Sequence, residues 1–226
     1  MQYNALENKS PISAEAAKKN ILYSCPECHQ ILNLQNALYA PPYFYHIKKN
    51  PECRQYKKSP IHLQIQKTIS QLLPLSESTL ETPLYSINRI ADIVWEKGKI
   101  IFEIECSSLS VEEVKKRYYD YESLGFLPIW ILHDSQYNRK KLSDAEYFLR
   151  SKYCYFTNIN EKGEGEIYDQ EDLCRGCERV YKGSKVLIDL QNPCLLQKNN
   201  LPLVEKKKFS LLRIYKIFLH LLLESI

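Results

Sequence analysis

The chain has 226 residues, of which 44% are hydrophobic and 26% are charged, and its formal net charge is +4. This composition excludes a disordered or fibrous protein and fits one globular domain of ordinary size with a smaller module or tail. The mildly basic charge permits a nucleic-acid partner without requiring one.

The N-terminal stretch MQYNALENKSPISAEAAKKN contains no apolar segment of the kind that a secretory signal needs. We therefore expect a cytoplasmic protein. In that compartment the 8 cysteines are expected to be thiols or metal ligands rather than disulfides.

Cysteines and histidines cluster in residues 21–55, a segment with little hydrophobic periodicity. Thiolate and imidazole are the ligands that zinc prefers, and four protein ligands predict a closed, structural site. A redox pair is the rival interpretation of the C-x-x-C spacing, but it leaves the later ligands unexplained. His29 is the alternative histidine. The predicted zinc ligands are Cys25, Cys28, His46 and Cys53.

The segment SPIHLQIQKTISQLL, residues 59–73, predicts a helix. Its apolar residues recur at helical spacing, with Ser59 as the N-cap and Pro60 in the first turn. A turn at Gly98 predicts a β-hairpin. Strands are expected around 80–86, at 89–95 and at 100–106.

An S-x-x-E capping box at Ser110 predicts a helix that runs to about Leu124. The almost wholly apolar run FLPIWILH, residues 126–133, suits a strand that is buried on both faces. Since a helix separates it from the strand at 100–106, the two strands should form a βαβ crossover and pair in parallel.

These elements predict an α/β fold with a small mixed β-sheet flanked by helices, behind an N-terminal zinc-binding module. We place the module at residues 1–57 and the core at 58–150. Residues 151–226 form a C-terminal region that contains cysteines and ends in a basic amphipathic stretch.

The C-terminal half is harder to interpret. A helix is expected at 143–151, and the residues Cys154, Cys174, Cys177 and Cys194 could form a second zinc site, with looser spacing than the first. The tail VEKKKFSLLRIYKIFLHLLLESI is interrupted by charged residues, so we expect no integral membrane span. An amphipathic helix that docks on the body is favoured over one that binds a membrane surface or a partner.

Three acidic residues interrupt the apolar pattern of the hairpin RIADIVWEKGKIIFEIECSSLS. Glu103 and Glu105 lie two apart in a strand and so share a face, and Asp92 can come opposite them. Carboxylates that converge in a sheet repel one another unless a cation such as Mg²⁺ or Mn²⁺ joins them. The alternative is that these acids lie on a solvated sheet face.

Several motifs occur in the order seen in the competence protein CoiA-like family, and the resemblance covers roughly residues 3–133. The motifs are YNALENKSPISAEAAKK, YSCPECHQ, YFYH, SPIH, RIADIV, FEIECSSLS and KRYYDYESLGFLPIWIL. That family is similar to PD-(D/E)XK nucleases, with a zinc module ahead of a restriction-endonuclease-like core.

The resemblance implies roles for particular residues. Asp92 and Glu103 would hold magnesium or manganese, and Arg117 and Tyr121 match the arginine and tyrosine of the helix that follows. Arg117 could grip a scissile phosphate; the alternative is that it pairs with Glu103 or Glu113 and that Tyr121 fills core space. The zinc ligands match Cys25, Cys28, His46 and Cys53. The implied activity is metal-dependent cleavage of DNA, single- or double-stranded, and competence or recombination proteins are the implied partners.

The chain departs from the family pattern at several positions. Glu105 stands where the family usually has Gln and related nucleases have Lys, which adds negative charge to the site. His62 is kept in the helix at 59–73, but Gln66 stands where a lysine is common. That helix also lacks an acidic residue, for which Glu81 is a substitute candidate.

Two functions of different classes follow. The first is a metal-dependent nuclease-like enzyme, with Asp92, Glu103, Glu105, Arg117 and Tyr121 as the catalytic set. The second is a catalytically inactive nuclease fold that binds DNA or protein and is held together by zinc. A redox protein that uses Cys25 and Cys28 is a third, weaker interpretation.

Overall fold

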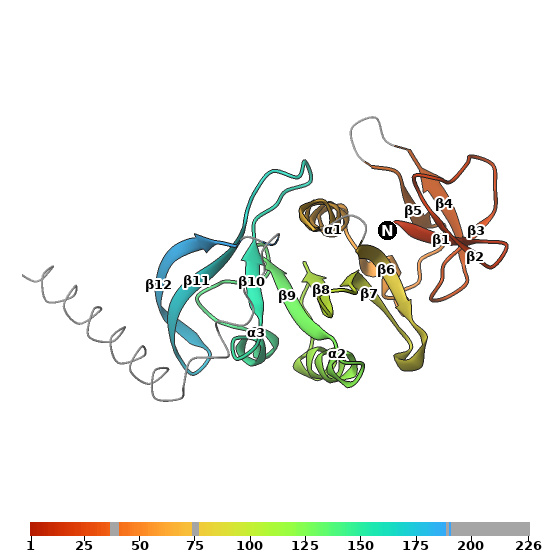
Figure 1. Cartoon of the computed structure of the whole chain (residues 1–226). Helices are drawn as coiled ribbons and strands as arrows, with labels where there is room; N and C mark the ends of the chain where they lie inside the picture. Colours follow the sequence, from red (N-terminus) through yellow and green to blue (C-terminus); the bar gives the residue numbers. More distant parts are fainter. Residues whose placement is uncertain (37–40, 74–76, 189, 191–226) are drawn as a thin grey trace, which may run out of the picture. The chain divides into compact units, whose positions relative to one another are not determined.

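The computed structural model of the chain describes residues 1–36, 41–73, 77–188 and 190. Two β-sheets dominate this part of the chain, one of five strands and one of seven. Figure 1 shows both sheets and the helices that accompany the larger one. The predicted mixed α/β fold is therefore confirmed.

The five-stranded sheet forms the N-terminal module and is antiparallel throughout, in the order β2-β1-β3-β4-β5. The side chains of Tyr23, Leu32 and Phe44 are buried in its core together with Cys25 and Cys53. The strands are β1 (Asn4–Glu7), β2 (Ser10–Ser13), β3 (Tyr23–Ser24), β4 (Ile31–Gln35) and β5 (Tyr43–His46).

A short 3₁₀ helix, η1 (Gln55–Lys57), leads from this module into α1 (Pro60–Leu72). Ser59 caps α1 as predicted, since its side chain accepts a hydrogen bond from the amide of His62. The apolar side chains of Ile65 and Ile69 are fully buried.

The predicted hairpin and the strand before it are present. They form β6 (Ser78–Leu84), β7 (Arg89–Trp95) and β8 (Ile100–Glu105), which pair antiparallel, and η2 (Tyr85–Ile87) lies between β6 and β7.

The predicted crossover is also confirmed. The helix α2 (Val111–Ser123) is capped by Ser110, and β9 (Leu127–His133) then pairs in parallel with β8. Residues of β8 and β9 are buried almost without exception, as expected of strands covered on both faces.

The larger sheet continues beyond the predicted core. A short helix α3 (Asp144–Leu149) precedes β10 (Cys154–Thr157), which pairs in parallel with β9. The antiparallel strands β11 (Ile167–Arg175) and β12 (Glu178–Leu187) follow. The sheet order is β12-β11-β10-β9-β8-β7-β6.

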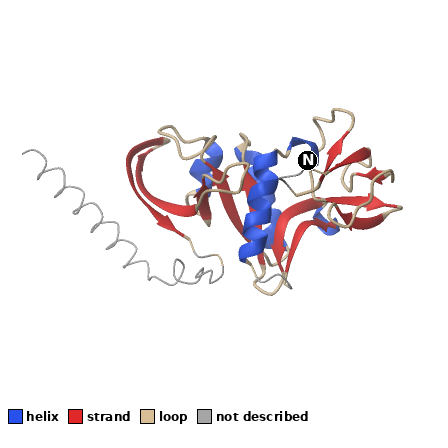
Figure 2. Cartoon of the chain, turned by 90° about the horizontal axis from the view of Figure 1, so that it is seen from above, coloured by secondary structure: helices blue, strands red, loops and turns tan. Residues whose placement is uncertain are grey.

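Helices cover both faces of the larger sheet. Figure 1 shows α1 on one face and α2 and α3 on the other, and Figure 2 shows the same elements from above. Beneath α2 and α3 the core contains Val114, Trp130, Leu149, Phe156 and Tyr168.

Of the helices in the described part of the chain, none combines the length and the apolar character that a membrane crossing requires. The predicted tail helix and Cys194 lie outside the described residues.

Candidate functional site

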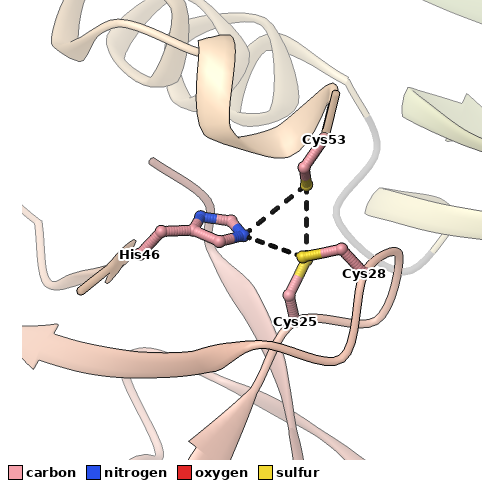
Figure 3. Close-up of side chains that lie close together, drawn as sticks. All are labelled: Cys25, Cys28, His46 and Cys53. Carbon is pink, nitrogen blue, oxygen red and sulfur yellow. Dashed lines mark hydrogen bonds between the residues drawn. The ribbon is translucent and has the colours of Figure 1, made fainter. Parts of the chain in front are cut away.

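Four predicted metal ligands meet in the N-terminal module. Their ligand atoms all lie within 4.8 Å of one another. Cys25 Sγ is 3.8 Å from Cys53 Sγ, and His46 Nε2 is 3.3 Å from Cys28 Sγ and 3.5 Å from Cys53 Sγ. Figure 3 shows the four side chains pointing toward one another, Cys25 and Cys28 from one turn and His46 and Cys53 from two other segments. We call them the Cys3His group.

The spacing of the Cys3His group fits a tetrahedral metal ion. Zinc with Zn–S bonds of about 2.3 Å and Zn–N bonds of about 2.0 Å would place two sulfurs about 3.8 Å apart and a sulfur and a nitrogen about 3.5 Å apart. The observed distances of 3.8, 3.3 and 3.5 Å agree with these values. The group could therefore hold a structural metal.

A tight turn aims the first two sulfurs. The amide of Glu27 donates to Cys25 Sγ at 3.4 Å, and the amide of His29 donates to the Cys25 carbonyl at 2.9 Å. His29 itself has a left-handed φ of 59° and an exposed side chain. It does not belong to the Cys3His group, which uses His46 as the histidine.

The side chain of Glu27 ties this turn to the segment that carries Cys53. Its carboxylate accepts from Arg54 Nε at 2.6 Å and from the Gln55 amide at 3.1 Å. The Arg54 guanidinium also donates to the carbonyl of Asn88 at 3.0 Å, next to β7. The turn is thus connected to the strand that carries Asp92.

The predicted acidic residues line one cavity of about 560 Å³, which we call the acidic cavity. Four acidic residues and six lysines or arginines line it, so the cavity combines a carboxylate centre with surrounding positive charge. The acids are Asp92, Glu103, Glu105 and Glu113, and the bases are Arg54, Lys57, Lys58, Arg89, Lys116 and Arg117.

Asp92 lies where β7 and β8 stop pairing. The paired positions end at Ile93 and Phe102, and beyond them the Asp92 carboxylate accepts the Ile104 amide at 2.9 Å through Oδ2. Its other oxygen, Oδ1, accepts from donors that belong to α1 or directly precede it. These are Lys58 Nζ at 2.9 Å, His62 Nε2 at 3.1 Å and Gln66 Nε2 at 3.1 Å.

These donors decide the protonation of Asp92. Burial opposes its ionisation, but the charges of His62 and Lys58 and the hydrogen bonds outweigh burial, so the pKa of Asp92 lies well below its ordinary value. The side chain is therefore an anion at neutral pH.

Glu103 faces α2 instead. It accepts from Tyr121 Oη at 2.7 Å and from Arg117 Nη1 at 3.0 Å. Burial, followed by repulsion from the Asp92 carboxylate, raises the pKa of Glu103 despite these two partners. Burial also raises the pKa of Tyr121 well above its ordinary value, so its hydroxyl stays a donor.

Glu105 is the least engaged of the three predicted acids. It accepts from the amide and hydroxyl of Ser107 at 3.3 and 2.8 Å, and its other oxygen lies 3.8 Å from Arg117 Nη1. Arg117 also donates to Glu113 at 2.9 Å. The predicted residues Arg117 and Tyr121 therefore do lie beside the predicted carboxylates.

Residues 58–165 match the family model described as competence protein CoiA, nuclease-like domain. The chain is therefore similar to this nuclease-like domain family over these residues. The resemblance drawn from the motifs is thus confirmed over that range, which contains the acidic cavity's carboxylates but not the Cys3His group. No curated protein and no solved structure matches the chain.

Two basic residues that line the acidic cavity were not predicted from the sequence. Lys58 was not predicted, although its ammonium lies 2.9 Å from Asp92 and 3.0 Å from Glu81. Arg89 pairs with Glu113 at 2.9 Å and Asp120 at 2.6 Å and was not singled out. The motif SPIH, which begins one residue after Lys58, was the signal that could have drawn attention to it.

Glu81, the substitute candidate for an acid in the first helix, lies on β6 and has a left-handed φ of 46°. Its Oε2 accepts the amides of Tyr3 and Asn4 at 2.8 and 2.9 Å, and its Oε1 accepts from Lys58. Glu81 thus joins the N-terminal strand to Lys58.

The second predicted cysteine set is spread over the end of the larger sheet. Cys154 lies on β10, Cys174 on β11 and Cys177 in the turn before β12. Within the described ranges, the Cys3His group alone brings three or more His, Cys, Asp or Glu ligand atoms within 4.8 Å. Because Cys194 lies outside those ranges, the second zinc site stays a prediction.

Proposed function

We propose that the chain is a metal-dependent phosphodiesterase that acts on DNA, with its reaction centre in the acidic cavity. The observation that carries the proposal is the convergence of Asp92 and Glu103 on one cavity lined by six basic side chains. The match of residues 58–165 to a nuclease-like domain family supports the same chemistry.

The donor set of the cavity fits a hard divalent cation. Magnesium is usually held by one or two carboxylates together with water and substrate phosphate oxygens. Asp92 and Glu103 would supply those carboxylates, with Glu105 beside them. A bound cation would lower the pKa of a coordinated water and stabilise the leaving oxygen of a phosphodiester.

The basic residues of the cavity suit the substrate. Lys57 and Lys116 are exposed and line the cavity, so they can contact phosphates of a nucleic acid. Arg117 is held by Glu103 and Glu113 and presents its guanidinium at the carboxylate centre. Since such contacts release counterions, binding should weaken steeply with salt.

We also propose that the metal in the Cys3His group is zinc and that it is structural. All four positions of a tetrahedral shell are supplied by protein side chains, which leaves none for a substrate. The pairing of Cys28 with His46 and of Cys25 with Cys53 favours this role over a redox pair.

A catalytically inactive binding protein is the second candidate, and one observation favours it. Among the described residues, no three His, Cys, Asp or Glu side chains of the acidic cavity bring one ligand atom each within 4.8 Å of one another. Instead, Asp92 is engaged by Lys58, and Glu103 by Arg117 and Tyr121.

Cleavage of labelled single- and double-stranded DNA with Mg²⁺ or Mn²⁺ tests the proposal. The wild-type protein should cut at least one substrate, and Asp92→Asn should lower the rate by about a hundredfold or more, because a positioned catalytic group typically contributes 10²–10⁴-fold.

Glu96→Gln is the matched control, since Glu96 is an exposed acid of the same hairpin whose ion-pair partner in the described part of the chain is the exposed Lys99. It should retain the wild-type rate. DNA binding without cleavage under either metal would support the inactive binding protein instead.

A further inference from the structure

Lys58 is a buried cation in direct contact with a carboxylate that the proposed cation site needs. Only 8% of its side chain is exposed, and its ammonium lies between Asp92 Oδ1 at 2.9 Å and Glu81 Oε1 at 3.0 Å. A buried ammonium needs such partners, since removal from water is costly for an unpaired charge.

The position of Lys58 is set by several contacts outside the cavity. Glu81 is fixed by the amides of Tyr3 and Asn4. The carbonyl of Lys58 accepts from the N-terminal ammonium at 3.2 Å. Its segment begins at Cys53 of the Cys3His group and leads through η1 into the cap of α1.

Asp92 has little spare capacity for a metal ion in this arrangement. Its Oδ1 accepts three donors and its Oδ2 accepts the Ile104 amide. A cation that binds Oδ1 must therefore displace a donor. Lys58 is the donor that can leave Asp92 most easily, because its ammonium keeps an ion pair with Glu81.

We propose that Lys58 is a resident counter-ion of the acidic cavity, which a divalent cation displaces from Asp92 and which then stays on Glu81. In the absence of the cation, Lys58 neutralises Asp92 and offsets the repulsion between Asp92 and Glu103. When the cation binds, the displaced ammonium remains beside it, within the cavity that would receive a phosphodiester. This inference rests on the proposed function for the cation site.

If Lys58 has this role, two substitutions should shift the affinity for the cation in opposite directions. Lys58→Met removes the competing charge, so the protein should bind Mn²⁺ about tenfold more tightly or better, given the strength of a charge pair at this distance. Glu81→Gln removes the carboxylate that receives the displaced ammonium, so Mn²⁺ should bind several-fold more weakly.

The affinities are measured by calorimetric titration of the full chain with Mn²⁺. Lys57→Met is the matched control, because Lys57 is an exposed neighbour that lines the same cavity and has no described contact with Asp92. It should change the affinity far less than Lys58→Met. Asp92→Asn should abolish the binding, and thermal melting of each variant shows that it is folded.

An unchanged or weaker Mn²⁺ affinity in folded Lys58→Met overturns the role of Lys58. If that variant does not fold, an affinity of Glu81→Gln equal to or tighter than wild type overturns it. Absence of Mn²⁺ binding by the wild type overturns the counter-ion and the cation site together. If the two substitutions shift Mn²⁺ affinity in opposite directions but the protein never cuts DNA, the proposed activity is wrong and the counter-ion role of Lys58 is supported.

Discussion

Glu103 is the residue whose protonation should control cation binding in the acidic cavity. Its pKa is raised by burial and then by the Asp92 carboxylate, whereas the pKa of Asp92 is lowered. As pH falls toward the raised pKa, Glu103 becomes neutral first while Asp92 stays ionised. As the pH is lowered, Mn²⁺ affinity should therefore be lost before the pH reaches the ordinary glutamate pKa of about 4.3. Titrations with Mn²⁺ between neutral and mildly acidic pH measure this loss.

Glu103→Gln should bind Mn²⁺ weakly and lose this pH dependence. Glu113→Gln is the control, since the pKa of Glu113 is lowered by Arg117 and Arg89 despite partial burial. It should keep the wild-type profile. A steep pH dependence that persists in Glu103→Gln would assign the titration to another group.

Residue spacing predicted part of the site but not all of it. The two-residue spacing of Glu103 and Glu105 and the four-residue spacing of Arg117 and Tyr121 define shared faces, and these residues do line one cavity. The ion pairs of Lys58 with Asp92 and Glu81 join residues that are 34 and 23 positions apart. No local pattern fixes such contacts, so sequence reasoning missed them.

The helix α2 carries Arg117 and Tyr121 to the cavity, so its first turn matters for the site. Ser110 Oγ accepts the Glu113 amide at 3.2 Å, which satisfies one of the free donors of that turn. Ser110→Ala should lower the free energy of unfolding by about 1 kcal/mol. Urea denaturation followed by far-UV circular dichroism measures this change.

Ser123→Ala at the other end of α2 is the matched control. The Ser123 hydroxyl donates to the Asp120 carbonyl and caps no free amide. Its loss should change stability by no more than about 0.5 kcal/mol. Equal effects of the two substitutions would show that the Ser110 cap contributes nothing specific.

Elements with a strong local signal were predicted well, and elements that depend on distant partners were not. Capping boxes, apolar stripes and the Gly98 turn located α1, α2 and the β7–β8 hairpin within a residue or two. The short strands β1–β5 show little hydrophobic periodicity in the sequence. They pack on a small core beside the Cys3His group and bury few apolar side chains each. The long strands β11 and β12 went unrecognised because β12 is largely exposed and lacks alternation.

At the scale of the whole described chain, the Cys3His group and the acidic cavity are joined by one short segment. Cys53 belongs to the group, and Lys58 contacts Asp92. The Arg54 guanidinium bridges Glu27 of the ligand turn and the carbonyl of Asn88 beside β7. A change at the Cys3His group should therefore reach the cavity through residues 53–58.

Removal of the metal from the Cys3His group should destabilise the protein and loosen the ion pair of Lys58 with Asp92. Structural zinc contributes on the order of 10 kcal/mol in small zinc modules, so even a third of that amount would lower Tm by roughly 10 °C. We expect Cys53→Ser to release the zinc, to lower Tm by at least this amount and to tighten Mn²⁺ binding at Asp92, because Lys58 then competes less well for that carboxylate. Zinc content, thermal melting and Mn²⁺ titration measure the three effects.

His29→Asn is the control, because His29 follows Cys28 directly, has an exposed side chain and is not a member of the Cys3His group. It should retain the zinc, the Tm and the Mn²⁺ affinity. If Cys53→Ser loses zinc and stability but keeps wild-type Mn²⁺ affinity, the two sites are independent, and the contacts of residues 53–58 serve only to hold the N-terminal module in place. If Mn²⁺ affinity rises in step with zinc loss, the segment transmits the state of the Cys3His group to Asp92 through Lys58.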